Sequence, residues 1–77
     1  MGPRLPRVTG NEVIRALRRG GGYPDHQHGS HVYLKHSSHP GMRVTVAVHS
    51  GEIIKPKTLL SILKQAELSI EEFQELL

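Results

Sequence analysis

The residues best suited to chemistry in this 77-residue chain are its six histidines, His26, His28, His31, His36, His39 and His49. Five of them fall within fourteen residues, but they are dispersed and therefore do not resemble a purification tag. Histidine takes up and releases protons near neutral pH, and it also ligates metal ions. The absence of cysteine excludes a thiolate nucleophile and a zinc–thiolate site.

Metal binding is the weaker of these two possibilities. His26 and His28 are spaced to share one strand face, with His31 close in sequence. However, Asp25 and Glu52 are the only carboxylates between residues 23 and 66, and thiolates are lacking. We therefore predict neither a metal site nor another cofactor.

Apolar and polar residues alternate in two stretches, 31–36 and 42–49. This pattern predicts an antiparallel hairpin whose turn lies at 37–41. One face of this hairpin is apolar and should form the floor of the core: Val32, Leu34, Val44, Val46 and Val48. The other face, without a carboxylate, carries His31, Tyr33, Lys35, Arg43, Thr45, Ala47 and His49. Its two imidazoles and two cations suit an anionic partner and proton transfer.

Cleavage of RNA is one reaction that such a face could perform. RNA supplies its own nucleophile, the 2′-hydroxyl, so an enzyme needs only to move protons and to neutralise charge on phosphorus. A histidine such as His31 can move the protons, and Lys35 and Arg43 could hold phosphate. The alternative is a module that binds RNA without cutting it, through shape and phosphates, because the chain has only three aromatic residues for base stacking.

The remaining patterns supply the elements that would position this face. Capping boxes at Thr9–Glu12 and Ser69–Glu72 predict helix starts, and the three glycines at 20–22 end the first helix. A weaker strand is expected at 23–28, with Gly29 as a turn, and Pro56 suits the first turn of another helix. The sequence thus predicts one α+β domain over residues 1–77, with a helix at 10–19, a three-stranded antiparallel sheet, a helix and a short C-terminal helix.

The charge distribution favours a partner that carries phosphates. The net charge is +3, but residues 1–22 carry +4, residues 23–66 carry +3 and the last eleven residues carry −4. Lys55 and Lys57 lie near a helix start, where cations oppose the dipole, and this placement favours a role in binding phosphate. No apolar run approaches the roughly 18 residues of a membrane span, and residues 1–10 lack the apolar region of a secretory signal. We therefore expect a cytoplasmic protein.

Taken together, these segments resemble the HicA family, the small toxins of HicAB toxin–antitoxin pairs. The resemblance covers nearly the whole chain in order and rests on these segments: Leu5-Pro-Arg-Val-Thr-Gly-Asn-Glu-Val-Ile-Arg-Ala-Leu17, Gly29-Ser30-His31-Val-Tyr-Leu34, Arg43-Val-Thr-Val-Ala-Val-His49-Ser-Gly51, Ile54-Lys-Pro56, Thr58-Leu-Leu-Ser-Ile-Leu-Lys-Gln-Ala66 and Ser69-Ile-Glu-Glu-Phe73. One departure is that Asp25-His26-Gln27-His28 stands where the family favours Arg, Gln and Lys.

The resemblance implies a fold similar to double-stranded-RNA-binding domains and ribosome-independent cleavage of mRNA. It also implies that the histidine of Gly-Ser-His, here His31, is catalytic, and that a HicB antitoxin covers the site. We expect Gly29 and Ser30 to shape the approach of the phosphate. Backbone phosphates would be held by Lys35, Arg43, Lys55 and Lys57, and His28 and His49 are the auxiliary candidates for the complementary proton transfer. The competing hypothesis is an RNA-binding module, or a degenerate toxin that binds antitoxin without cutting RNA.

Overall fold

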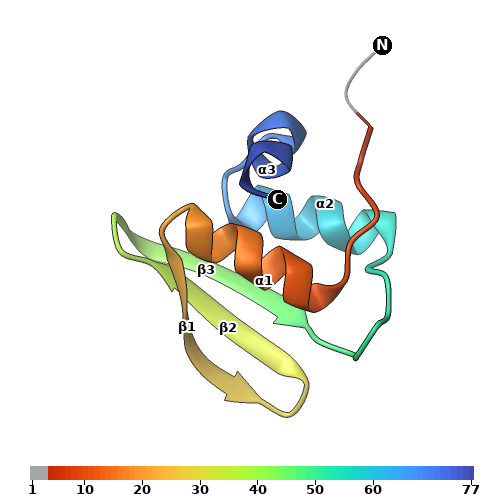
Figure 1. Cartoon of the computed structure of the whole chain (residues 1–77). Helices are drawn as coiled ribbons and strands as arrows, with labels where there is room; N and C mark the ends of the chain where they lie inside the picture. Colours follow the sequence, from red (N-terminus) through yellow and green to blue (C-terminus); the bar gives the residue numbers. More distant parts are fainter. Residues whose placement is uncertain (1–3) are drawn as a thin grey trace.

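The computed structural model describes residues 4–77 and contains three helices and three strands (Figure 1). In chain order these are α1 (Gly10–Arg19), β1 (Gly22–His28), β2 (His31–His36), β3 (His39–Ala47), α2 (Pro56–Gln65) and α3 (Ile70–Leu76). The predicted α+β order of helix, three-stranded antiparallel sheet, helix and short helix is confirmed. Within residues 4–77, none of the helices is long and apolar enough to cross a membrane.

The sheet has the order β1-β2-β3, and both pairs are antiparallel. The helices lie on one side of this sheet and leave its other face uncovered (Figure 1). Val32 and Leu34 of β2 are buried beneath the helices, as are Val44 and Val46 of β3, which pair with Leu34 and Val32. The predicted division of the hairpin into an apolar face and an open face is therefore confirmed.

Helix α1 begins and ends where its local sequence requires. The Thr9 side chain accepts from the backbone N–H of Glu12 at 3.3 Å, and the Glu12 carboxylate accepts from the backbone N–H of Thr9 at 2.9 Å. At the other end, the Gly20 N–H donates to Ala16 O, and Gly21 has a φ of +100°, which favours glycine. The chain then enters β1 directly.

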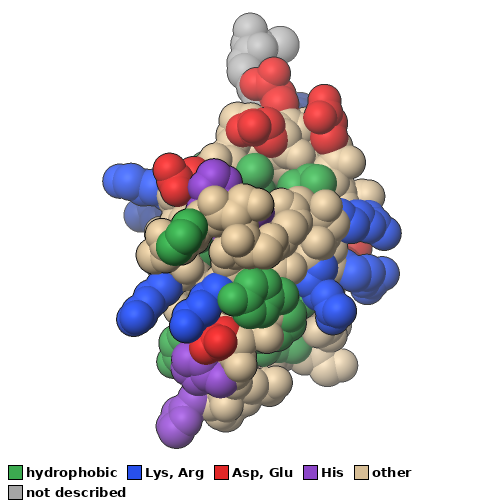
Figure 2. Space-filling model, turned by 90° about the vertical axis from the view of Figure 1, so that its left-hand side faces the viewer, with side chains coloured by type: hydrophobic (Ala, Val, Ile, Leu, Met, Phe, Trp, Pro, Cys, Tyr) green, Lys and Arg blue, Asp and Glu red, His purple; other side chains and the backbone are tan. Residues whose placement is uncertain are grey.

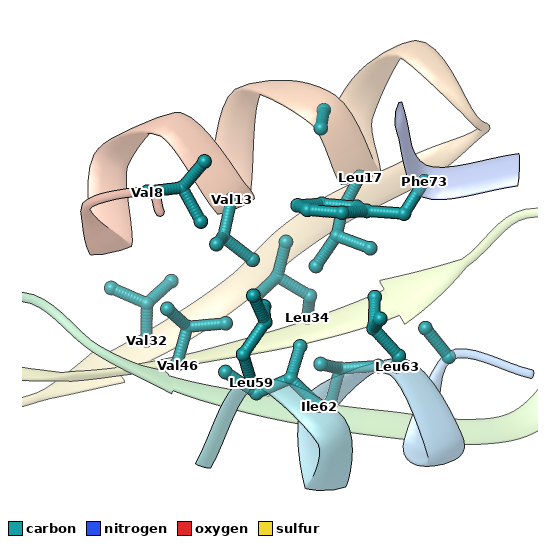
Figure 3. Packing of buried hydrophobic residues seen from close by; sticks show 13 residues of the cluster. Val8, Val13, Leu17, Val32, Leu34, Val46, Leu59, Ile62, Leu63 and Phe73 are labelled. Atoms are coloured by element: carbon teal, nitrogen blue, oxygen red, sulfur yellow. The ribbon is translucent and has the colours of Figure 1, made fainter. Parts of the chain in front are cut away.

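One core joins five of the six elements, α1, β2, β3, α2 and α3, whereas β1 contributes no buried residue (Figure 3). Its buried members are Val8, Val13, Ala16, Leu17, Val32, Leu34, Val44, Val46, Leu59, Ile62, Leu63, Ala66 and Phe73. Phe73 is fully buried, and its ring lies between α1 and α2 in Figure 3. The predicted second capping box holds the start of α3, since Ser69 and Glu72 exchange backbone–side-chain hydrogen bonds of 2.8 and 3.0 Å.

The boundaries of β3 differ from the predicted 42–49. His36 pairs with His39, so the turn contains only two residues, 37 and 38, and β3 already begins at His39. Between the pairs His36–His39 and Leu34–Val44, four residues of β3 stand opposite Lys35 alone. This bulge contains Pro40 and Gly41, residues that weaken a regular ladder, and their presence made the segment look like a turn. At its other end β3 stops at Ala47, two residues before His49.

Candidate active site

His31 is the first residue of β2, the middle strand, and it lies on the open face at one end of the sheet. It is exposed, and it pairs with His28 on β1 and with Ala47 on β3. Its immediate neighbour Val32 is buried on the opposite face. The imidazole is therefore accessible to a large ligand that approaches the uncovered side of the sheet.

The turn that precedes His31 is tight. Gly29 and Ser30 alone connect β1 to β2, and Gly29 has a φ of +61°, which residues with a Cβ rarely adopt. The carbonyl of Ser30 accepts from the backbone N–H of Val48 at 2.8 Å, which extends the β2–β3 pairing to the edge of the turn. These contacts fix His28 and His31 opposite each other, and no atom lies within 4 Å of the position that a Cβ of Gly29 would occupy.

A bulge in β1 brings a carboxylate to the same face. Pro24 pairs with Leu34 and His26 with Tyr33, so Asp25 is an extra residue between them. As a result, Asp25 and His26 lie on one side of the sheet, although they are consecutive. The Asp25 carboxylate lies 2.9 Å from His26 Nδ1 and 3.7 Å from Lys35 Nζ. The hydrogen bond from His26, together with the charge of Lys35, holds the pKa of Asp25 below its usual value of 3.8.

The His26 ring has a second fixed contact. It stacks on the ring of Tyr33, with the centroids 4.5 Å apart and the planes within 11°. Its side chain nevertheless remains 61% exposed. The stacking and the hydrogen bond to Asp25 together restrict the orientation of this imidazole on the open face.

The predicted cations divide into two groups. Lys35 and Arg43 are each four residues along their strand from the row that contains His31 and Ala47, which is about 13 Å at about 3.3 Å per residue. Both lie near the end of the sheet at which the turn joins β2 to β3, and both line a shallow hollow there. Lys55 is at the His31 end, because it lines a pocket with Ala47 and His49. Lys57 is exposed in the first turn of α2.

The other two histidines, His36 and His39, belong to the far end of the hairpin. His36 Nε2 donates to Gly20 O at 2.7 Å, and its Nδ1 accepts from the Ser38 N–H at 3.0 Å. The His36 ring thereby joins the end of α1 to the β2–β3 turn, and it packs against His39 with the ring centroids 4.5 Å apart. Among residues 4–77, no three His, Asp or Glu side chains are grouped so that they could hold a metal ion.

The distribution of charge over the surface is uneven (Figure 2). Acidic side chains gather mainly at the top of the view, and most of the visible histidine surface lies in the lower half, beside one acidic side chain and below several Lys and Arg side chains. The sheet end of the molecule is therefore the end suited to an anion.

Residues 10–68 match the family model described as the HicA toxin of bacterial toxin–antitoxin. The chain belongs to the HicA toxin family. The HicA match runs from the first residue of α1 to just beyond α2, and it includes the whole sheet and His31. A search of curated proteins found no match.

Within this HicA chain, sequence reasoning missed the position of Asp25 on the open face. Alternation along a regular strand would place Asp25 and His26 on opposite faces. A signal was nonetheless present in Pro24, because proline inside a strand is confined to edges and bulges.

Proposed function

We propose that this toxin is an endoribonuclease that cleaves mRNA, with His31 as a general acid or base. The supporting observation is the exposed position of His31 on the uncovered face of the sheet, between His28 and Ala47. One proton must leave the 2′-hydroxyl and another must reach the departing 5′-oxygen. A positioned imidazole contributes typically ~10²–10⁴-fold to such transfers. The proposal requires no metal and no covalent enzyme intermediate.

The geometry supports different roles for the surrounding residues. The tight turn at Gly29 and Ser30 gives the RNA backbone room to approach the imidazole. Lys55 is the predicted cation at the His31 end of the sheet and would stabilise charge near the reacting phosphate. Lys35 and Arg43, about 13 Å along the strands, would bind phosphates of neighbouring nucleotides. Lys57 would extend this phosphate contact at the start of α2, and His49 remains an auxiliary candidate beside Lys55.

A HicB-like antitoxin is the proposed protein partner. Membership in a toxin–antitoxin family implies an antitoxin, and the open face is the surface whose coverage would block access to His31. We propose that the antitoxin binds there. Since the substrate is mRNA, the activity belongs in the cytoplasm.

The test is cleavage of a long RNA by the purified protein in the presence of EDTA. We expect the wild type to cut and His31→Ala to lose at least about 100-fold in rate. The matched control is His39→Ala, because His39 is also an exposed histidine but lies at the far end of the hairpin. Equal cleavage by wild type and His31→Ala would overturn the proposal and indicate a contaminating nuclease. Tight RNA retention without any cleavage would instead support the RNA-binding module.

A further inference from the structure

We propose that His26 is the second catalytic histidine of the open face, with Asp25 as its positioning residue and His31 as its partner. This inference rests on the proposed ribonuclease function. It assigns the complementary proton transfer to a residue that the bulge in β1 brings into place.

The reaction needs two proton-transferring groups. One group takes the proton from the 2′-hydroxyl while the 2′-oxygen forms a bond to phosphorus. The bond between phosphorus and the 5′-oxygen breaks, and the second group donates a proton to that oxygen. The products are a 2′,3′-cyclic phosphate and a free 5′-hydroxyl, so protons and electrons balance without a further reactant.

The contact with Asp25 determines which nitrogen of His26 carries a proton. Because the pKa of Asp25 is lowered, this carboxyl is ionised at neutral pH and can only accept hydrogen bonds. His26 Nδ1 must therefore be the donor across the 2.9 Å contact. This leaves Nε2, which has no hydrogen-bond partner among residues 4–77, free to accept or donate a proton. A carboxylate that fixes the tautomer and orientation of a histidine is a known catalytic arrangement.

The positions of the two residues on the sheet suit a phosphodiester between their side chains. His26 pairs with Tyr33, which is two residues along β2 from His31, so His26 and His31 are diagonal neighbours on the same face. The backbone positions of such neighbours are about 7–8 Å apart across an antiparallel pair. This separation leaves room for a phosphate, with one imidazole near the 2′-oxygen and the other near the 5′-oxygen.

His28 is the competing candidate, and the structure favours His26 over it. His28 lies directly opposite His31, which leaves less space for a phosphate between the two rings. Among the described residues, His28 has neither a carboxylate partner nor a stacked ring, whereas His26 has both. The His26 ring contacts Asp25 from β1 and Tyr33 from β2, and Lys35 of β2 lies 3.7 Å from the same Asp25 carboxylate.

The experiment compares three alanine variants, at His26, His31 and His28, on two versions of one short RNA. In the second version, sulfur replaces the bridging 5′-oxygen at the single cleavage site. A thiolate leaves without protonation, so this substrate does not need a general acid. Circular dichroism and thermal unfolding establish that each variant is folded.

On the ordinary RNA, we expect His26→Ala and His31→Ala each to lose at least about 100-fold, and His28→Ala to lose less than about threefold. On the sulfur substrate, one of the two slow variants should recover most of the wild-type rate, and this identifies the general acid. The inference is overturned if His26→Ala cuts ordinary RNA at nearly the wild-type rate, or if neither slow variant recovers. Should His31→Ala also cut normally, the proposed function itself fails, so the two failures are distinguishable.

Asp25→Asn tests the positioning role separately, because it should affect catalysis and binding in opposite directions. An amide can turn its NH2 group toward Nδ1 and favour the wrong tautomer, so the cleavage rate of bound RNA should fall at least about tenfold. Removing the negative charge next to Lys35 should at the same time tighten binding of an RNA whose scissile 2′-oxygen is methylated. A merely structural residue would weaken both. Unchanged cleavage by Asp25→Asn would contradict its assignment.

Discussion

Two anions compete for the ammonium group of Lys35. One is the Asp25 carboxylate beside it, and the other is the RNA phosphate that we propose it binds. Its Nζ lies 3.7 Å from the carboxylate, and both side chains are partly exposed. An exposed pair of this kind contributes little to stability, but the carboxylate reduces the positive potential that Lys35 offers to RNA. Arg43 has no acidic partner among the described residues, so it should be the stronger phosphate ligand.

This difference predicts the salt dependence of RNA binding. For single-stranded RNA, each phosphate contact contributes about −0.7 to the slope of log K against log salt concentration. Arg43→Ala should reduce the slope by about this amount, and Lys35→Ala should reduce it by less. Binding measured from low to moderate salt with a non-cleavable RNA checks the order, and Lys64→Ala on α2 is the control that should change nothing. Equal effects of the Lys35 and Arg43 variants would contradict the role given to Asp25.

Helices α1 and α3 both begin with a capping box. In each, the hydroxyl of the N-cap residue accepts from the backbone N–H of a glutamate, and the glutamate carboxylate accepts from the backbone N–H of the N-cap residue. Hydrogen bonds from the backbone and side chain of Ser69 lower the pKa of Glu72, and those of Thr9 lower the pKa of Glu12 in the same way. Each carboxylate therefore stabilises its helix while it is ionised. Since α1 and α3 both pack on the shared core, these local starts also support the sheet.

The lowered pKa of Glu72 predicts a pH-dependent effect of its removal. The stabilisation is fully present above the unfolded pKa of 4.5 and is lost as the pH falls through the lower folded pKa. Glu72→Ala should therefore be less stable than Glu71→Ala near neutral pH, and this difference should shrink at about pH 3. Glu71 is the matched control because it lies in the same first turn without the capping contact. Urea unfolding at the two pH values measures the difference, and a gap that persists in acid would refute this account.

The stability of the whole molecule depends on a core to which α3 contributes Phe73. Helix α3 lies outside residues 10–68, the region that matches the family model. Phe73 comes from the last helix, but it packs between α1 and α2 and has no exposed surface. A domain of this size has a total stability of about 4–12 kcal/mol. One large aromatic ring is thus a substantial part of what holds the helices on the sheet.

Phe73→Ala should cost about 3–5 kcal/mol, because it removes a buried ring and leaves a cavity. At about 4 °C or more per kcal/mol for a domain of this length, the melting temperature should fall by at least about 12 °C. Thermal unfolding followed by circular dichroism measures the change. The control is Leu60→Ala, since Leu60 is 49% exposed on α2 and should have a small effect. Similar melting temperatures for the two variants would show that Phe73 does not anchor α3.

The sequence by itself determined the order of the elements and the two faces of the hairpin, although it did not give the bounds of β3. The capping boxes at Thr9 and Ser69, and the alternation around Val32 and Val46, depend on neighbouring residues, so local spacing was sufficient to predict them. It also placed His31 on the open face. The tertiary structure alone decided which groups accompany His31: the bulge that turns Asp25 to the side of His26, and the fold that brings Lys55 beside Ala47. Register and bulges arise from pairing between strands, and the position of Lys55 follows from the pairing of Ile53 with Thr9 and the hydrogen bond from Ile54 N–H to Val8 O. These are contacts between distant parts of the chain, which a local pattern does not contain.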